Sequence, residues 1–281
     1  MKKGLVLEGG GILGISYIGC IKELYNNNIK FNHFIGTSVG SIICAALSCN
    51  IPIDEIENSI MNLNLNNFKQ NRYWIFGNFY RLFKNWGWFM TNNLESWIED
   101  TLYTSTGIHS ITFQQIYDKF GNYLIIPAYS LTEQKIHYFD ISTSPNLSVS
   151  KACVMSCSIP LYFQTQSYNN NIYVDGGLID NYPIQKMVDL VGIQNTIGLK
   201  LINNNKQHKI SNLTNYIRFL INKLLELAIE KHVSTDNWNI TLPIYVNNID
   251  FLNFNISNQN KKWLIHQGKS AAIKYIQNIQ K

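Results

Sequence analysis

The sequence predicts an α/β protein whose mostly parallel central sheet is covered by helices on both faces. Short apolar runs alternate along the chain with segments whose apolar residues recur at helical spacing, and glycine loops join several of them. Such alternation is typical of βαβ units, whose connecting helices cover both faces of a sheet. With 281 residues, 46% of them hydrophobic, the chain is long enough for one large domain.

The first part of the chain contains two strand–loop–helix units. Residues 3–7 form a short apolar run that ends at glycines, and apolar residues recur at helical spacing through 12–26. Residues 32–36 predict a second strand, and the apolar segment 41–48 predicts a helix buried against the sheet. Pro52 begins a further helix, whose acidic first turns suit the helix dipole.

The alternation resumes after an irregular, aromatic-rich stretch at 62–92. Strands are expected at 123–130, 135–140, 172–174, 196–202 and 240–246. Helices are expected at 93–103, 111–120, 148–158, 211–232 and 257–280.

The net charge of +5 is unevenly distributed. Residues 1–199 carry 12 basic and 14 acidic side chains, whereas residues 200–281 carry 11 and 4. A basic C-terminal third suits an anionic partner such as phospholipid head groups or nucleic acid, and a solvated basic face explains it equally well. We expect one domain over 1–281, in which a basic, helix-rich part at 201–281 packs on a core at 3–200.

Neither a membrane span nor a signal peptide is expected. Polar residues interrupt every apolar run before it reaches the roughly 18 residues of a transmembrane helix. Glu8 and three glycines interrupt the apolar region that a signal peptide would need after Lys2 and Lys3. The five cysteines lack zinc spacing and fall mostly at apolar helical positions, so we expect no metal site and a reducing compartment. We also expect no cofactor, and a cytoplasmic location with peripheral membrane contact.

Residues 36–40, Gly-Thr-Ser-Val-Gly, fit the nucleophile elbow of serine hydrolases. In that motif a serine lies at a sharp turn between a strand and a helix, and the flanking glycines let neighbouring backbone approach closely. The pattern is common by chance, but here it follows an apolar run and precedes an apolar helix, as an elbow requires. We therefore predict Ser38 as a nucleophile, with Gly36 and Gly40 shaping the turn.

Residues 9–14, Gly-Gly-Gly-Ile-Leu-Gly, match both a dinucleotide-binding loop and an oxyanion hole. A dinucleotide site needs an acidic residue about 20 positions later to hold the ribose. No carboxylate lies between Glu23 and Asp54, so the oxyanion interpretation is favoured. The residues assigned to this motif are Gly9, Gly10, Gly11 and Gly14.

A serine nucleophile needs a base, and two routes are open. A histidine relay would use His208, His232 or His266, although these lie in polar or helical stretches without a loop signature. Alternatively, a carboxylate acts on the serine directly. Asp175 ends a short apolar strand and is followed by Gly176 and Gly177, a turn that allows close approach and partial burial of the acid.

These motifs together resemble the patatin-like phospholipase family. The family pattern is a glycine-rich loop, then Gly-x-Ser-x-Gly, then Asp-Gly-Gly or Asp-Gly-Ala, and all three occur here in order. Residues 155–163 and 175–183 resemble the blocks that precede and continue the aspartate motif. The resemblance covers about residues 3–200 and implies a patatin-like three-layer sandwich.

By this resemblance, Ser38 is the nucleophile and Asp175 the base of a dyad without histidine, and the glycine loop holds the oxyanion. The implied activity is a lipid acyl hydrolase of the phospholipase A or lysophospholipase type. Its expected partners are an acyl-lipid substrate and, transiently, a membrane surface, with no nucleic acid; many relatives need an activating protein. Leu13 departs from the family's Lys or Arg, which removes a positive charge near the anion site.

Other functions remain compatible with the sequence. A Ser-His-Asp esterase, an acyltransferase that uses the same acyl-enzyme, and a non-catalytic lipid-binding protein all fit parts of the pattern. The aromatic stretch, which includes Trp74, Trp86 and Trp88 with basic residues interleaved, suits either a membrane interface or an aromatic cap over the core.

Overall fold

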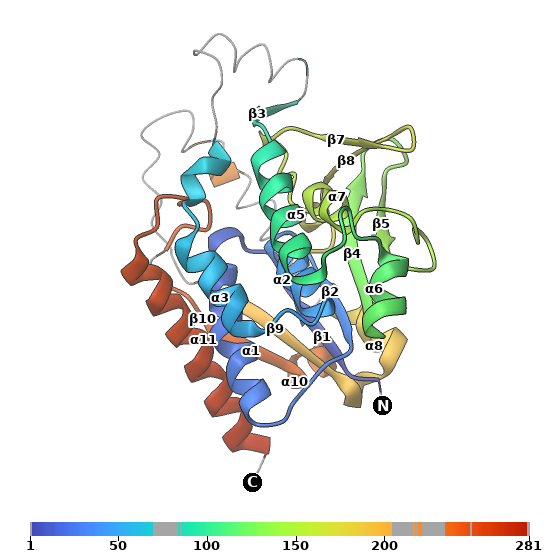
Figure 1. Cartoon of the computed structure of the whole chain (residues 1–281). Helices are drawn as coiled ribbons and strands as arrows, with labels where there is room; N and C mark the ends of the chain where they lie inside the picture. The colour runs from blue at the N-terminus through green and yellow to red at the C-terminus, as the bar shows by residue number, and fades with distance from the viewer. Residues whose placement is uncertain are drawn as a thin grey trace.

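The computed structural model describes residues 2–69, 84, 86–203, 216, 219–220, 234–247 and 249–279. Its main sheet has the strand order β10-β9-β1-β2-β4-β8-β7, and β5 pairs with β4 beside this path (Figure 1). In chain order these strands are β1 (Gly4–Leu7), β2 (His33–Gly36), β4 (Tyr123–Ser130), β5 (Lys135–Phe139), β7 (Gln166–Tyr168), β8 (Asn171–Asp175), β9 (Thr196–Ile202) and β10 (Thr241–Tyr245).

The sheet is mostly parallel, as predicted. Strands β10, β9, β1, β2 and β4 all pair in parallel, whereas β5 and β8 pair with β4 antiparallel, and β7 pairs with β8 antiparallel. The central strand β1 shows why both faces must be covered. Its side chains alternate, so Leu5 and Leu7 join one hydrophobic cluster and Val6 joins another on the opposite face.

Helices cover both faces. The helices, in order, are α1 (Ile15–Asn26), α2 (Val39–Ser48), α3 (Ile53–Asn62), α5 (Asn92–Thr106), α6 (Phe113–Phe120), α7 (Val149–Ser156), α8 (Ile184–Val191), α10 (Thr235–Asn239) and α11 (Asn258–Ile279). Ile184, Met187 and Val191 of α8 pack in the cluster that contains Val6. The larger cluster, on the other face, draws on α1, α2, α3, α5, α7 and α11.

The C-terminal helix α11 lies directly against α1, and the two run side by side in Figure 1. Two glycines allow this close contact. A Cβ on Gly19 would lie 1.9 Å from the carbonyl oxygen of Ile265, and one on Gly268 would lie 1.8 Å from that of Ser16. The single domain expected over 1–281 stays a prediction.

Several local expectations differ from the structure. The helix expected at 12–26 begins as a 3-10 turn at Gly11–Gly14 and continues as α1. Helix α8 and the three-residue strands β3 (Gly87–Phe89), β6 (Leu161–Phe163) and β7 were not predicted. The helix expected at 211–232 lies almost wholly outside the described residues.

Candidate active site

Ser38 lies at the sharp turn between β2 and α2. Its φ of +53° and ψ of −126° place it in a region that non-glycine residues rarely occupy. The flanking glycines are required by close backbone approach: a Cβ on Gly36 would lie 2.3 Å from the Gly40 carbonyl, and one on Gly40 would lie 2.6 Å from the oxygen of Leu7. This is the geometry of a nucleophile elbow, with the serine at its apex.

Asp175 ends β8 opposite Ala128 of β4 and is 3% exposed. Its carboxylate accepts a hydrogen bond from the backbone N–H of Gly177, at 2.7 Å, and lies within electrostatic reach of the Ser38 hydroxyl. Burial raises the pKa of Asp175 from its ordinary 3.8 to about 7, against the opposing effects of the Gly177 N–H and the Ser38 hydroxyl. A serine hydroxyl beside a buried carboxylate of raised pKa is suited to proton transfer.

The two glycines after Asp175 are also fixed by space. A Cβ on Gly176 would lie 2.6 Å from the carbonyl oxygen of Pro127, and one on Gly177 would lie 2.5 Å from the side-chain oxygen of Asn181. Larger residues would therefore displace the turn that holds the carboxylate.

The end of α7 holds Ser38 and Asp175 in register, which sequence reasoning about the site did not foresee. The backbone N–H of Ser38 donates to the Ser156 hydroxyl at 3.0 Å, and the N–H of Asp175 donates to the Ser158 carbonyl at 2.9 Å. The signal was present in residues 155–163, which resemble a family block, but no contact was assigned to them.

The glycine loop approaches the elbow from β1. The N–H of Gly9 donates to the Asn181 carbonyl at 2.9 Å, and the Asn181 side chain donates back to the Gly9 carbonyl at 3.0 Å. Gly9 therefore anchors the loop and has no free N–H for an oxyanion. Within the part of the chain that the structure describes, the N–H groups of Gly10 and Gly11 donate to no protein acceptor, and Gly11 lines the cavity beside Ser38.

Gly14 and Leu13 have other surroundings. A Cβ on Gly14 would lie 2.6 Å from Val39, so this glycine lets the loop pack against the start of α2. Leu13 is 4% exposed and belongs to the main hydrophobic cluster. The position at which the resemblance implies a Lys or Arg is thus an apolar core position here.

A buried ion pair supports the start of the glycine loop. Glu8 and Lys200 are 2% and 5% exposed, and the Lys200 ammonium lies 2.6 Å from the Glu8 carboxylate. The second carboxylate oxygen of Glu8 accepts from the backbone N–H of Leu201 at 2.7 Å. Burial raises the pKa of Glu8, and the nearby Lys200 opposes that rise. The pair ties the loop to β9.

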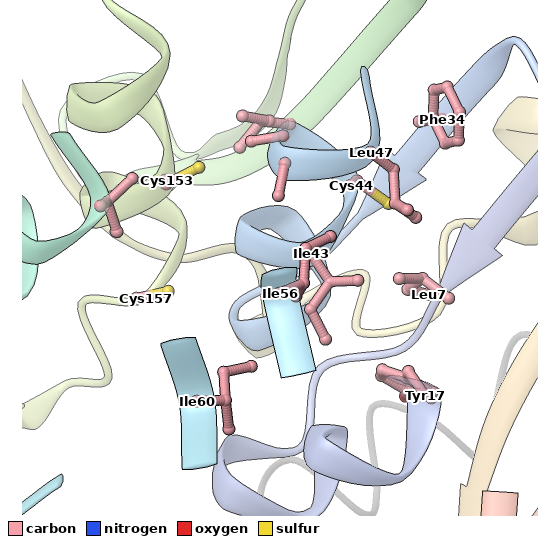
Figure 2. Close-up of a cluster of buried hydrophobic side chains, with 14 of the residues drawn as sticks. Leu7, Tyr17, Phe34, Ile43, Cys44, Leu47, Ile56, Ile60, Cys153 and Cys157 are labelled. Carbon is pink, nitrogen blue, oxygen red and sulfur yellow. The ribbon is translucent and has the colours of Figure 1, made fainter. Parts of the chain in front are cut away.

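An apolar cavity opens beside Ser38. It holds about 720 Å³ of empty space, its mouth included, and its walls come from α2, α3, α5 and the segment after β10. The lining includes Ile42, Ile60, Trp97, Phe163 and Leu252. Figure 2 shows Ile43 of α2 close to Ile56 and Ile60 of α3, with Cys157 nearby. Such a lining suits a hydrocarbon chain.

Of the three candidate histidines, only His266 is among the described residues, and it is exposed on α11. His208 and His232 lie outside the described residues. All five cysteines are buried and unpaired, as small hydrophobic residues are. Across the described ranges, no group of three His, Cys, Asp or Glu side chains is arranged to hold a metal ion. No helix in those ranges is both long and apolar enough to cross a bilayer.

Comparison with known proteins identifies the family. The model for the patatin-like phospholipases matches residues 5–188, a span that holds the elbow, the glycine loop and Asp175. The chain belongs to the patatin-like phospholipase family.

Relatives of this patatin-like chain include viral and yeast proteins. Uncharacterized protein R571 of Acanthamoeba polyphaga mimivirus is 29% identical over 95% of this chain and 91% of its own length. Probable lipid hydrolase 463L of Invertebrate iridescent virus 6 is 33% identical over 65% of this chain and 62% of its own. Triacylglycerol lipase 4 of Saccharomyces cerevisiae is 25% identical over 71% of this chain, which spans only 24% of that lipase.

Solved structures share the patatin-like fold. VipD from Legionella pneumophila superposes with a TM-score of 0.70 at 14% identity, covering 99% of this chain and 67% of VipD. The type III effector protein ExoU gives a TM-score of 0.57 at 13% identity, covering 99% of this chain and 53% of ExoU. Lipid hydrolysis is therefore the activity associated with this family and with its named relatives.

Proposed function

We propose that this protein is a lipid acyl hydrolase that cleaves ester-linked fatty acids through a Ser38–Asp175 dyad. The Ser38 hydroxyl at the apex of the elbow, within reach of the buried Asp175 carboxylate and beside an apolar cavity, is the observation that carries the proposal. Among the described residues no histidine acts on Asp175, and we assign the role of proton acceptor to this carboxylate. The substrate class is a phospholipid, a lysophospholipid or another acyl lipid.

The reaction proceeds in two balanced halves. Ser38 Oγ attacks the ester carbonyl carbon while its proton passes to Asp175, and the N–H groups of Gly10 and Gly11 stabilise the negative charge on the carbonyl oxygen. Asp175 then returns the proton to the leaving alkoxide as the acyl–oxygen bond breaks. In the second half, Asp175 takes a proton from water, the hydroxide attacks the acyl-enzyme, and the fatty acid leaves as Ser38 regains its proton.

The pKa of Asp175 fits this cycle. A base must be ionised to start the reaction and must hold a proton long enough to return it, which a pKa of about 7 allows near neutral pH. The cavity supplies the remaining requirement, because it removes the acyl chain from water while the ester lies at Ser38.

Product analysis tests the proposal. Wild type and Ser38→Ala are incubated with mixed phospholipids, lysophospholipids and triacylglycerols, and released fatty acids are quantified. Wild type is expected to release fatty acid, and Ser38→Ala is expected to lose at least about a thousandfold in rate. Equal release from both proteins would end the proposal. Failure of a fluorophosphonate probe to label Ser38 in the folded protein would favour a non-catalytic lipid-binding protein instead.

The alternative base is tested on the same substrates. His208→Ala, His232→Ala and His266→Ala are each expected to retain turnover, because the dyad needs no imidazole. Loss of turnover at one of them in a folded protein would favour a Ser-His-Asp esterase. An alcohol added as acceptor would reveal an acyltransferase through formation of a new ester.

We further propose that the protein meets its substrate at a lipid surface. Trp86 and Leu161 are 57% and 50% exposed. Trp86 directly precedes Gly87 of β3, and Gly87 is paired with Leu161 of β6. Exposed tryptophan suits a membrane interface. Replacement of Trp86 and Trp88 by Ser is expected to weaken flotation with liposomes, and unaltered flotation of the folded variant would contradict this.

A further inference from the structure

A second apolar cavity lies directly behind the first. It is a narrow cavity of about 330 Å³, open solvent at its mouth included, and is lined by residues that include Ala46, Ile56, Ser59 and Leu102. The two cavities share four lining residues: Ile42, Ile43, Ile60 and Trp97. These four side chains therefore form a wall that has the acyl cavity on one side and the second cavity on the other.

Three different helices contribute to this wall. Ile42 and Ile43 come from α2, Ile60 comes from α3 and Trp97 comes from α5. Ile43 and Ile60 are 1% and 7% exposed, and they lie near each other in Figure 2. An apolar partition between two apolar spaces is chemically suited to meet the end of a hydrocarbon chain.

The C-terminal end of α3, which carries Ile60, is held firmly. Lys261 of α11 is 3% exposed, and its ammonium donates to the carbonyl oxygens of Ile60 at 2.9 Å, Met61 at 3.2 Å and Leu63 at 2.8 Å. The ammonium thus donates to two carbonyls of the last turn of this helix and to that of the residue that follows it. The position of Ile60 in the wall is fixed by these bonds as well as by packing.

We infer that the Ile60 wall sets the upper limit of acyl-chain length, and that the second cavity is a reserve subsite that longer chains reach only when the wall is opened. The inference rests on the proposed hydrolase function, since it concerns the chain of the same acyl ester. It goes beyond that function because it assigns substrate selectivity to named residues.

The expected effect follows from chain burial. Each buried methylene contributes about fourfold in an equilibrium or rate constant. Ile60→Ala removes three carbons, which makes room for roughly two further methylenes of substrate, so the preference for a long chain over a short one rises about fifteenfold. Ile60→Val removes one carbon and is expected to raise the preference for a long chain by a smaller factor.

The test measures kcat/KM for a series of lysophospholipids from octanoyl to stearoyl, below their aggregation limits. Ile60→Ala is compared with Ile53→Ala, a matched truncation on the same helix at a residue that lines neither cavity. We expect the ratio of palmitoyl to octanoyl kcat/KM to rise in Ile60→Ala and Ile60→Val but not in Ile53→Ala. The double variant Ser59→Leu/Ile60→Ala fills the second cavity and is expected to return the ratio toward that of wild type.

The outcomes separate the two proposals. If wild type hydrolyses no ester, the proposed function fails, and chain selectivity is then measured as binding of fluorescent fatty acids of graded length. If wild type is active but Ile60→Ala and Ile60→Val leave the ratio unchanged, the wall does not limit the chain. A shift that Ser59→Leu fails to reverse would likewise refute the reserve subsite.

Discussion

The raised pKa of Asp175 predicts that its charge destabilises the folded protein at high pH. The carboxyl has an ordinary pKa of 3.8, and in the folded protein burial raises it to about 7. A raised folded pKa means that the folded state binds the proton more tightly than the unfolded state. The protonated carboxyl therefore contributes most to the free energy of unfolding below pH 3.8, and this contribution is lost as the pH rises through the folded pKa of about 7.

The magnitude follows from the separation of the two pKa values. One pKa unit corresponds to about 1.4 kcal/mol, so an ionised Asp175 above its folded pKa costs on the order of 4 kcal/mol. Asp175→Asn removes the charge and keeps an acceptor for the Gly177 N–H and the Ser38 hydroxyl. The variant is therefore expected to be inactive and more stable than wild type at alkaline pH.

Urea unfolding of both proteins across pH tests this reasoning. The excess stability of Asp175→Asn is expected to grow by about 2.5 kcal/mol between about pH 5 and pH 8, because wild type ionises in that interval. Asp100→Asn, at an exposed position, is the matched control and should show no comparable growth. A pH-independent difference, or a wild type that gains on the variant as pH rises, would refute the assigned burial effect. In wild type, kcat/KM should also fall about tenfold per pH unit below the pKa of the base.

Three further substitutions test the site's geometry. Ser38→Gly should inactivate the enzyme yet raise the free energy of unfolding by about 1 kcal/mol, because glycine adopts a positive φ without strain. Ser38→Ala should also inactivate the enzyme but without this gain in stability. Equal stability of the two variants would contradict this reasoning. Gly11→Ala should lose activity and more than about 2 kcal/mol of stability, because its Cβ would lie 2.3 Å from the carbonyl oxygen of Phe251. Gly121 has a similar φ but lies in open space, so Gly121→Ala should lose only about 1 kcal/mol of stability and remain active. Lys261→Met should lower the free energy of unfolding, measured by heat or urea, by about 3 kcal/mol. The matched variant at an exposed position, Lys262→Met, should lower it by almost nothing. A small loss at both positions would show that the three carbonyls do not depend on the Lys261 ammonium.

Local patterns predicted the parts of the fold that depend on short-range physics. The alternating apolar runs predicted the parallel core of the sheet, and the turn chemistry around Ser38 and Asp175 predicted an elbow and an acid that lie within electrostatic reach of each other. Strands β3, β6 and β7 were missed because three residues are too few to show a period.

Long-range contacts account for what the sequence could not show. Gly9 was grouped with Gly10 and Gly11 as an oxyanion donor, but its N–H is used by Asn181, which is distant in sequence. No periodicity marks such a partner. Leu13 likewise appeared as a lost charge near the anion site, whereas the fold turns this side chain into the core.

The carbonyl of Phe251 binds the N–H of Ile12 at 3.0 Å and packs on Gly11, so the loop after β10 braces the glycine loop near the start of the chain. Ribosomal synthesis delivers Ser38, Asp175 and the glycines long before Phe251. A nascent or truncated chain that ends earlier would hold both members of the dyad without the brace. We therefore expect the glycine loop to reach its final conformation late in translation, and a chain cut to the segment matched by the family model to lack this brace.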